Sequence, residues 1–132
     1  MCVCVCGGGG YARNRPCYLF ISAVCLWQAT IDVLKMDIEH SEWPAMMDIL
    51  AKGELSHVRQ LLMEYHLFNS GAQDIRERMP ILKQIEDLGF RRFYTHLNPM
   101  CGPLNNAYPV MRTTCYETYY VNTRFARTAP AE

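Results

Sequence analysis

The sequence predicts an α/β fold in which a mostly parallel sheet is closed by an antiparallel hairpin. Two observations carry this prediction. From residue 30 onward, β-branched and apolar runs alternate with helical patterns, and the chain closes on two strand-like runs joined by a loop rich in Pro, Gly and Asn. This alternation is typical of α/β sheets. With 132 residues, of which 50% are hydrophobic, the chain is long enough to form one domain with its own core.

The first strand is predicted at residues 30–39, which read T-I-D-V-L-K-M-D-I-E and turn acidic at the end. A continuous apolar run of this kind is typical of a strand buried on both faces of a parallel sheet. A helix is predicted at residues 42–52. Ser41 is its expected N-cap, and Gly53 is expected to end it in the left-handed conformation.

A second strand and helix repeat this pattern. The run H-V-R-Q-L-L-M-E-Y-H-L-F at residues 57–68 is strand-like. A helix is then expected to begin at Asp74, which forms a capping-box-like pair with Glu77, and to end at Gly89. Pro80 either kinks this helix or marks its first turn.

The last two strands are predicted at residues 90–97 and 115–125, on either side of a loop. A disulfide between Cys101 and Cys115 across this loop is one option in an oxidising compartment. Asn122 and Arg124 are expected on one face of the last strand, where they either face a substrate or bond across the hairpin.

Several large side chains are expected to fill the core or the sheet. Trp43 is predicted to pack in the core rather than to stack on a substrate. The methionines expected as core filler are Met46, Met47, Met63 and Met79. The tyrosines expected to be half-buried in the sheet are Tyr116, Tyr119 and Tyr120.

The first 29 residues are a different kind of sequence. They open on M-C-V-C-V-C-G-G-G-G, which we interpret as a low-complexity tail, because a phosphate-binding loop needs a strand before it and a helix after it. Residues 17–27 are apolar and follow two arginines, as in a secretory signal, but they are too short to span a bilayer. This segment leaves a secretory or membrane-anchored location open beside a cytoplasmic one. The alternative is a buried helix or strand.

Charge and cysteine spacing exclude several classes of protein. The 13 Lys and Arg residues balance the 13 Asp and Glu residues and form no run, so nothing indicates nucleic-acid binding. The seven cysteines contain no C-x-x-C pair, and C-x-C-x-C offers three ligands where a structural zinc site needs four. Charge and cysteine spacing therefore predict no nucleic-acid partner and no metal site at C-x-C-x-C. The shortness of the apolar segment predicts no transmembrane helix.

Four titratable side chains stand at the ends of the first two predicted strands. Asp37 and Glu39 end the first strand, and Glu64 and His66 end the second. Parallel neighbours would bring all four to one rim of the sheet, where α/β proteins bind ligands. Clustered carboxylates and a histidine suit general-base chemistry. Two alternatives remain open: the group holds a divalent cation, or it only caps the helix and bonds to the backbone. Lys35 is expected to pair with Asp37.

Four segments resemble those of a known family. The run D-V-L-K-M-D-I-E-H-S-E-W at 32–43 resembles the fourth-strand motif of the FkbM-type and methyltransferase-like-24-type proteins. The run Q-L-L-M-E-Y-H-L at 60–67 is similar to their fifth strand. The runs D-L-G-F-R-R-F at 87–93 and Y-V-N-T-R-F at 120–125 are similar to their sixth and seventh strands.

The resemblance implies a partial Rossmann-like methyltransferase fold. It covers residues 30–126 and corresponds to the C-terminal part of the domain, with residues 1–29 before it and 127–132 as a tail. The implied activity is methyl transfer from S-adenosylmethionine to an unidentified acceptor. The implied catalytic residues are Asp37, Glu39, Glu64 and His66, with Asp37 also at the cofactor.

Two departures from the family pattern bear on activity. His40 stands where the family has a small residue, and a bulky side chain would crowd that turn. Family members also carry three earlier strands, including a glycine-rich turn that approaches the cofactor. We find no pattern for them in residues 1–30, and therefore predict that this chain does not bind the cofactor tightly by itself and is truncated.

Two other functions compete with methyl transfer. The chain would be a non-enzymatic interaction module if the strand at residues 30–39 were an exposed edge that pairs with a partner or with itself. It would be a small divalent-metal-dependent enzyme if Asp37, Glu39, Glu64 and His66 held a cation.

Overall fold

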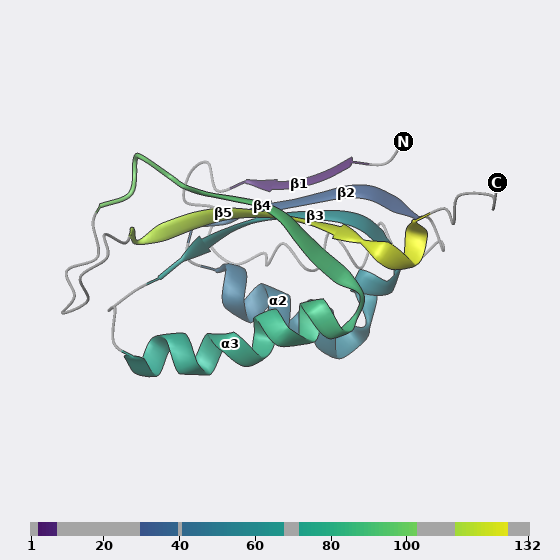
Figure 1. Ribbon diagram of the computed structural model, residues 1–132, viewed down its shortest axis with the longest axis horizontal. Coiled ribbons are helices and arrows are strands. Elements are labelled where there is room, and N and C mark those ends of the chain that lie inside the picture. The colour runs from purple at the N-terminus through teal and green to yellow at the C-terminus, as the bar shows by residue number, and fades with distance from the viewer. Residues whose placement is uncertain (1–2, 8–29, 40, 68–71, 103–112, 127–132) are drawn as a thin grey trace.

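A computed structural model describes residues 3–7, 30–39, 41–67, 72–102 and 113–126. In this part of the chain, five strands form one mixed sheet in the order β1–β2–β3–β5–β4 (Figure 1). The first three strands are parallel, and β5 runs antiparallel between β3 and β4. The strands are β1 (Val3–Gly7), β2 (Ile31–Asp37), β3 (Val58–His66), β4 (Phe90–Leu97) and β5 (Cys115–Asn122).

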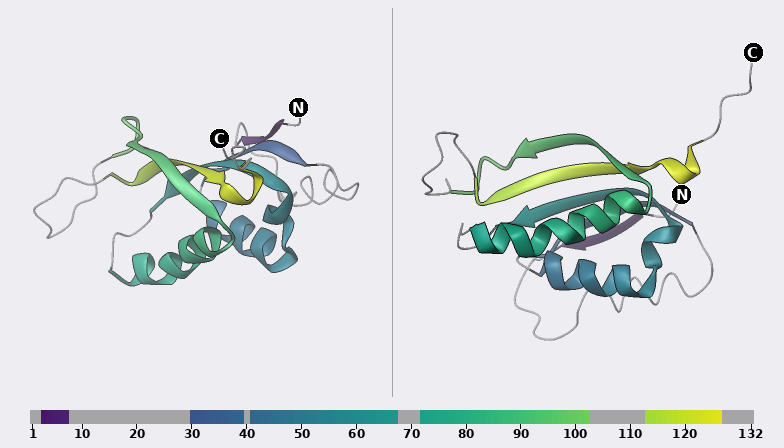
Figure 2. Two further views of the ribbon diagram at one scale, coloured as in Figure 1. Left: turned by 45° about the vertical axis from the view of Figure 1, so that its right-hand side comes forward. Right: turned by 60° about the horizontal axis from the view of Figure 1, so that its bottom comes forward.

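Helices α2 (Glu42–Lys52) and α3 (Ala72–Asp87) both lie on one face of this sheet (Figures 1 and 2). Short 3₁₀ turns follow α2 at Glu54–His57 and follow β5 at Thr123–Phe125. The core fills the space between the helices and the sheet. Its fully buried side chains include Leu34, Met36, Met46, Ile49, Leu61, Met63 and Ile85.

The mixed sheet and its antiparallel β4–β5 hairpin confirm the predicted α/β class. The insertion of β5 between β3 and β4 was not part of the prediction. β4 matches residues 90–97, whereas β2 and β3 are shorter than predicted at both ends. β5 ends at Asn122, because the Asn122 side chain accepts a hydrogen bond from Arg124 N (3.1 Å) and starts a 3₁₀ turn. Arg124 therefore does not share a strand face with Asn122, which instead donates to Val58 O (3.0 Å).

The backbone, rather than a capping side chain, forms the hydrogen bonds described at the ends of α2. Gly53 ends α2 with φ 70°, as predicted, and its N–H bonds to Leu50 O (3.1 Å). Ser41 precedes α2 but makes no side-chain cap hydrogen bond. Helix α3 begins at Ala72, two residues before Asp74, and Pro80 lies inside it rather than in its first turn.

Residues 3–7 are a strand, which corrects the interpretation of the N-terminus as a tail. β1 pairs in parallel with β2 from Val3 opposite Val33 to Gly7 opposite Asp37. The segment at residues 30–39 is therefore not an exposed edge, and self-association through it loses its basis. The apolar segment at 17–27 lies outside the described residues. In the described part of the chain, no helix is long and apolar enough to cross a membrane.

Two of the four methionines predicted in the core lie on the surface. Met46 and Met63 are buried, whereas Met47 and Met79 are exposed. Met46 and Met47 are neighbours on α2, so one residue step along the helix separates the core face from the solvent face.

These neighbours provide a test of the core. Met46→Ala removes a fully buried side chain (0% exposed) and is expected to lower the free energy of unfolding by about 2–5 kcal/mol. Met47→Ala, at a 59% exposed position, is expected to change it by less than about 0.5 kcal/mol. Urea unfolding of both variants measures the difference. Equal losses in the free energy of unfolding would show that the core face of α2 is assigned incorrectly.

The buried hydroxyls of Tyr65 and Tyr120 are hydrogen-bonded to each other. Burial raises the pKa of both tyrosines, and Tyr120 raises that of Tyr65 further. The folded state thus holds these protons more tightly than the unfolded chain does, so the stability they contribute is present below about pH 10 and is lost as the pH rises above it.

We therefore expect the urea midpoint to fall as the pH is raised from about 9 to about 11. Tyr65→Phe removes one titrating group and should give a shallower fall, while at neutral pH it costs about 1–3 kcal/mol because the Tyr120 hydroxyl loses its partner. An unchanged slope in Tyr65→Phe would show that this pair does not govern alkaline unfolding.

Candidate active site

A row of polar side chains crosses the sheet on the face opposite α2 and α3. Met36 on β2 is paired with Met63 on β3. The next residue on each strand, Asp37 and Glu64, therefore lie side by side. Glu64 is paired with Glu117 on β5, and Glu117 with His96 on β4. Since side chains alternate along a strand, this row points away from the buried methionines beside it.

Glu64 is a buried carboxylate near the centre of this row. Asn98 Nδ2 donates a hydrogen bond to its Oε1 at 2.7 Å. Burial raises the pKa of Glu64 above its usual value, the hydrogen bond from Asn98 opposes that rise, and the neighbouring Asp37 adds to it. Asp37 also forms the predicted ion pair with Lys35, at 3.5 Å between Nζ and Oδ2.

His66 is held in place through both its ring and its backbone. Its Nδ1 lies 3.0 Å from Oε1 of Glu42, and its Nε2 lies 3.8 Å from Oε2 of Glu39. Its carbonyl oxygen accepts from Trp43 Nε1 (2.9 Å) and from Arg78 Nη1 (2.6 Å). The imidazole is therefore fixed between the end of β3 and the first turn of α2.

The turn between β2 and α2 brings two acidic side chains to His66. Glu39 adopts φ 48°, a left-handed conformation that is uncommon outside glycine and asparagine and is often found at functional sites. Glu42 is fully buried, and its Oε1 also accepts from Ile38 N (3.2 Å). Glu42 thus fixes both the turn and the imidazole.

The predicted meeting of the strand ends is confirmed: Asp37 lies by Glu64, and Glu39 by His66. Their catalytic roles stay predictions. Nothing in the sequence indicated that Glu42 or the residues of the closing hairpin belong to the site. The residues missed are Asn98, Glu117 and His96, which lie on the closing hairpin or just after β4 and reach the row only through the register of β5.

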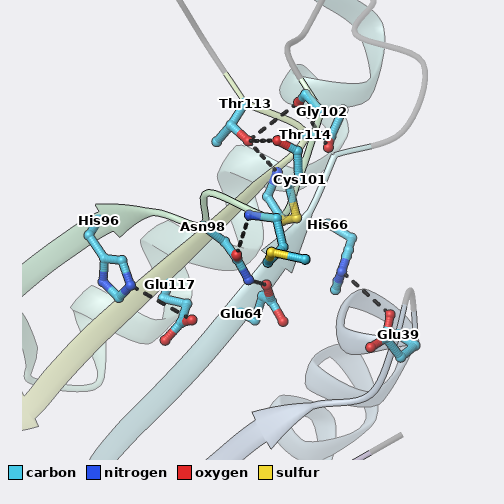
Figure 3. Close-up of a disulfide and its surroundings, with 12 residues drawn as sticks. Glu39, Glu64, His66, His96, Asn98, Cys101, Gly102, Thr113, Thr114 and Glu117 are labelled. Carbon is cyan, nitrogen blue, oxygen red and sulfur yellow. Dashed lines mark hydrogen bonds and ion pairs between the residues drawn. A yellow bond between two sulfur atoms is a disulfide. The ribbon is translucent and has the colours of Figure 1, made fainter.

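A disulfide joins Cys101, after β4, to Cys115 at the start of β5 (Figure 3). Their Cα atoms are 5.9 Å apart, within the usual range for a disulfide. The bond that the sequence left as an option is thus present in this structure. It lies beside Glu64 and His66, so the loop after β4 is tied to the polar end of the sheet.

A pocket of about 290 Å³ opens on the other face of the sheet, between α3 and the β4–β5 hairpin. Tyr65 lines this pocket, and its neighbours Glu64 and His66 point to the opposite face, so the pocket is separate from the polar row. Trp43 stacks on Tyr65 with ring centroids 5.1 Å apart and is largely buried, as predicted. The pocket is lined by Trp43, Tyr65, Leu67, Arg78, Met79, Leu82, Arg92, Thr95, Tyr116 and Thr118.

Comparison with known proteins identifies similar sequences. The model of the methyltransferase FkbM domain family matches residues 21–92. The chain is 30% identical over 103 residues to the probable methyltransferase-like protein 24 of Rattus norvegicus, and 29% identical over 103 residues to that of Homo sapiens. Each match covers 72% of this chain and 28% of the relative, so the chain spans about 28% of the length of these curated relatives. No solved structure matches.

The buried carboxylate of Glu42 provides a test of how the site is held. Glu42→Ala removes the acceptor of the Ile38 N–H and of His66 Nδ1, and we expect it to cost about 1–3 kcal/mol of folding free energy. Asp48→Ala removes a half-buried carboxylate of the same helix, which among the contacts described pairs only with Lys52, and should cost less than about 0.5 kcal/mol. Chemical denaturation compares them, and equal effects would contradict the structural role of Glu42.

Proposed function

Because this chain belongs to the FkbM methyltransferase family, we propose that it carries an S-adenosylmethionine site at the carboxyl ends of β1, β2 and β3, and that the chemistry is methyl transfer to an acceptor still to be identified. Open α/β sheets bind ligands in the crevice beyond the carboxyl ends of their parallel strands. The three parallel strands end together at this edge. The sheet order supports a Rossmann-like arrangement.

The pairing of Gly7 with Asp37 is the observation that carries the proposal. Gly7 is the last residue of β1, and in the sequence three more glycines follow it. A glycine at the end of a parallel strand lets the backbone approach a ligand closely, because there is no Cβ in the way. Asp37, directly beside it, offers carboxylate oxygens to hydroxyl or amino donors of the cofactor.

This geometry changes the expectation about affinity. Weak binding was predicted because the three earlier strands of the family, with their glycine-rich turn, were not recognised in residues 1–30, and β1 is one strand that runs into the glycines. The expectation that residues 1–30 supply none of these strands is therefore wrong for β1, and the affinity itself stays a prediction. Residues 8–29, where a following helix would lie, are outside the described part of the chain.

The side chains of the rim divide into two roles in this proposal. When bound, S-adenosylmethionine supplies a methyl group from its sulfonium. Asp37 holds the cofactor, while Glu64 and His66, at the end of the next strand, face the acceptor. Either of these two is placed to take the proton that the acceptor's nucleophilic atom loses, and Glu42 orients His66 for it. Glu39 lies on the other side of the ring, with its Oε2 3.8 Å from His66 Nε2.

Thermal unfolding with S-adenosylmethionine and with S-adenosylhomocysteine tests the proposal. A ligand that binds only the folded chain raises its stability by about 2.7 kcal/mol at 100 times Kd, so the unfolding midpoint should rise with ligand concentration. Asp37→Asn should need at least about tenfold more ligand for the same rise, which corresponds to about 1.4 kcal/mol.

Asp32→Asn is the matched control. Asp32 is the second residue of β2, at the end of the strand away from Asp37, and it pairs with Arg59. It should respond to both ligands as the unchanged chain does. A cooperative transition that neither ligand shifts would overturn the proposal and favour a folded member of the family that does not bind the cofactor.

A further inference from the structure

Four metal-ligating side chains converge at the disulfide. Glu64, His66, Cys101 and Cys115 each offer one ligand atom, and these four atoms all lie within 4.8 Å of one another (Figure 3). Glu64, His66 and Cys115 are buried, and Cys101 is half-buried. Two sulfurs, one imidazole nitrogen and one carboxylate oxygen form a ligand set that Zn²⁺ accepts in tetrahedral geometry.

The fold brings these ligands together through strand register. His66 on β3 is paired directly with Cys115 on β5, and Glu64 lies two residues earlier on the same side of β3. Cys101 is positioned by a turn in which its N–H donates to Asn98 O (3.2 Å). Next to it, Thr114 N donates to Gly102 O at 3.0 Å, which fixes the loop against β5.

The spacing of the four atoms suits one small ion. A tetrahedral Zn²⁺ with sulfur ligands at about 2.3 Å separates neighbouring ligand atoms by about 3.8 Å. The four ligand atoms, all within 4.8 Å of one another, are therefore near enough to share one ion once the S–S bond is broken. The backbone of three of the four residues, Glu64, His66 and Cys115, is already held in place by the pairing of β3 with β5.

Two of the ligands already have the partners that support metal ligands in proteins. Glu42 holds Nδ1 of His66 at 3.0 Å, which leaves Nε2 as the ring nitrogen to bind a metal, as in a carboxylate–histidine–zinc arrangement, and Glu39 Oε2 lies 3.8 Å from that nitrogen. Asn98 holds one oxygen of Glu64 at 2.7 Å and so orients its carboxylate. Support of this kind limits the reorganisation that metal binding requires.

We propose that this cluster is a redox-dependent zinc site, formed by Glu64, His66, Cys101 and Cys115 when the two cysteines are reduced. In the oxidised chain the two sulfurs bond to each other. A dithiol reductant supplies two electrons and two protons, which break the S–S bond and give two thiols, while the reductant becomes a disulfide. Each thiol then releases its proton as its sulfur binds Zn²⁺.

The site differs from the metal site considered from the sequence. That alternative used Asp37, Glu39, Glu64 and His66, and it placed the ion in the crevice at the strand ends. The cysteines replace Asp37 and Glu39, because the register of β5 and the turn before Cys101 bring them to Glu64 and His66. The zinc proposal does not depend on methyl transfer.

Residue-resolved alkylation tests the proposal on the unmodified sequence. The reduced full chain is treated with iodoacetamide with and without Zn²⁺, and the modification of each cysteine is followed by mass spectrometry. We expect Zn²⁺ to slow alkylation of Cys101 and Cys115 at least about tenfold, because metal-bound thiolates are withdrawn from reaction. Equal rates with and without Zn²⁺ at both cysteines would overturn the proposal.

A cobalt titration identifies the ligands. A variant with serine at the five other cysteines retains only the two in the cluster; those five are Cys2, Cys4, Cys6, Cys17 and Cys25. The reduced variant should bind one Co²⁺, with the intense tetrahedral bands and sulfur-to-cobalt charge transfer that two thiolates give. The oxidised variant should show neither band.

Further substitutions in that five-serine variant separate the ligands from their neighbours. Cys101→Ser with Cys115→Ser should abolish the charge-transfer band, and Glu64→Gln should weaken Co²⁺ binding about tenfold or more. Glu117→Gln is the matched control, because Glu117 pairs with Glu64 across the strands but is not in the ligand set. If Glu64→Gln and Glu117→Gln both lose Co²⁺ binding, or if both keep it, Glu64 is excluded from the site. Either result would contradict the proposal.

Discussion

β2 and β3 lie side by side in parallel, with Leu34 opposite Leu61 and Met36 opposite Met63, and the rest of the molecule depends on this pairing. These side chains lie on the face of the sheet against which α2 and α3 pack. Because both strands run in one direction, their acidic ends reach the same edge. The register of β2 against β3 thus determines which side chains meet in the core and which meet in the polar site.

The alternation of side chains along the strands gives the sheet two different faces. Tyr65 points under the helices, where it stacks on Trp43, while its neighbours Glu64 and His66 turn to the polar row. Glu42 links the two faces: it begins the helix that covers one side and holds the imidazole at the end of the other. The site is therefore built into the packing of α2 rather than added on flexible loops.

Pairing partners, rather than local pattern, explain where sequence reasoning failed. The short run before the glycines shows no distinctive strand signal, yet Gly7 pairs with Asp37 because β2 offers an edge to a parallel strand. The cysteines likewise carried no motif, since Cys101 and Cys115 are far apart from Glu64 and His66 in the sequence. They meet only because β5 inserts beside β3.

The sequence by itself determined the alternation of strands and helices, the left-handed end of α2 at Gly53, and the family, because apolar periodicity, glycine conformation and local motifs are properties of neighbouring residues. It also predicted that Asp37 and Glu64 would share an edge, through the rule for parallel strands. Only the tertiary structure decided the place of β1, the insertion of β5 and the grouping of Cys115 with His66. Hydrogen bonding between strands distant in sequence sets these pairings, and no short window of residues encodes them.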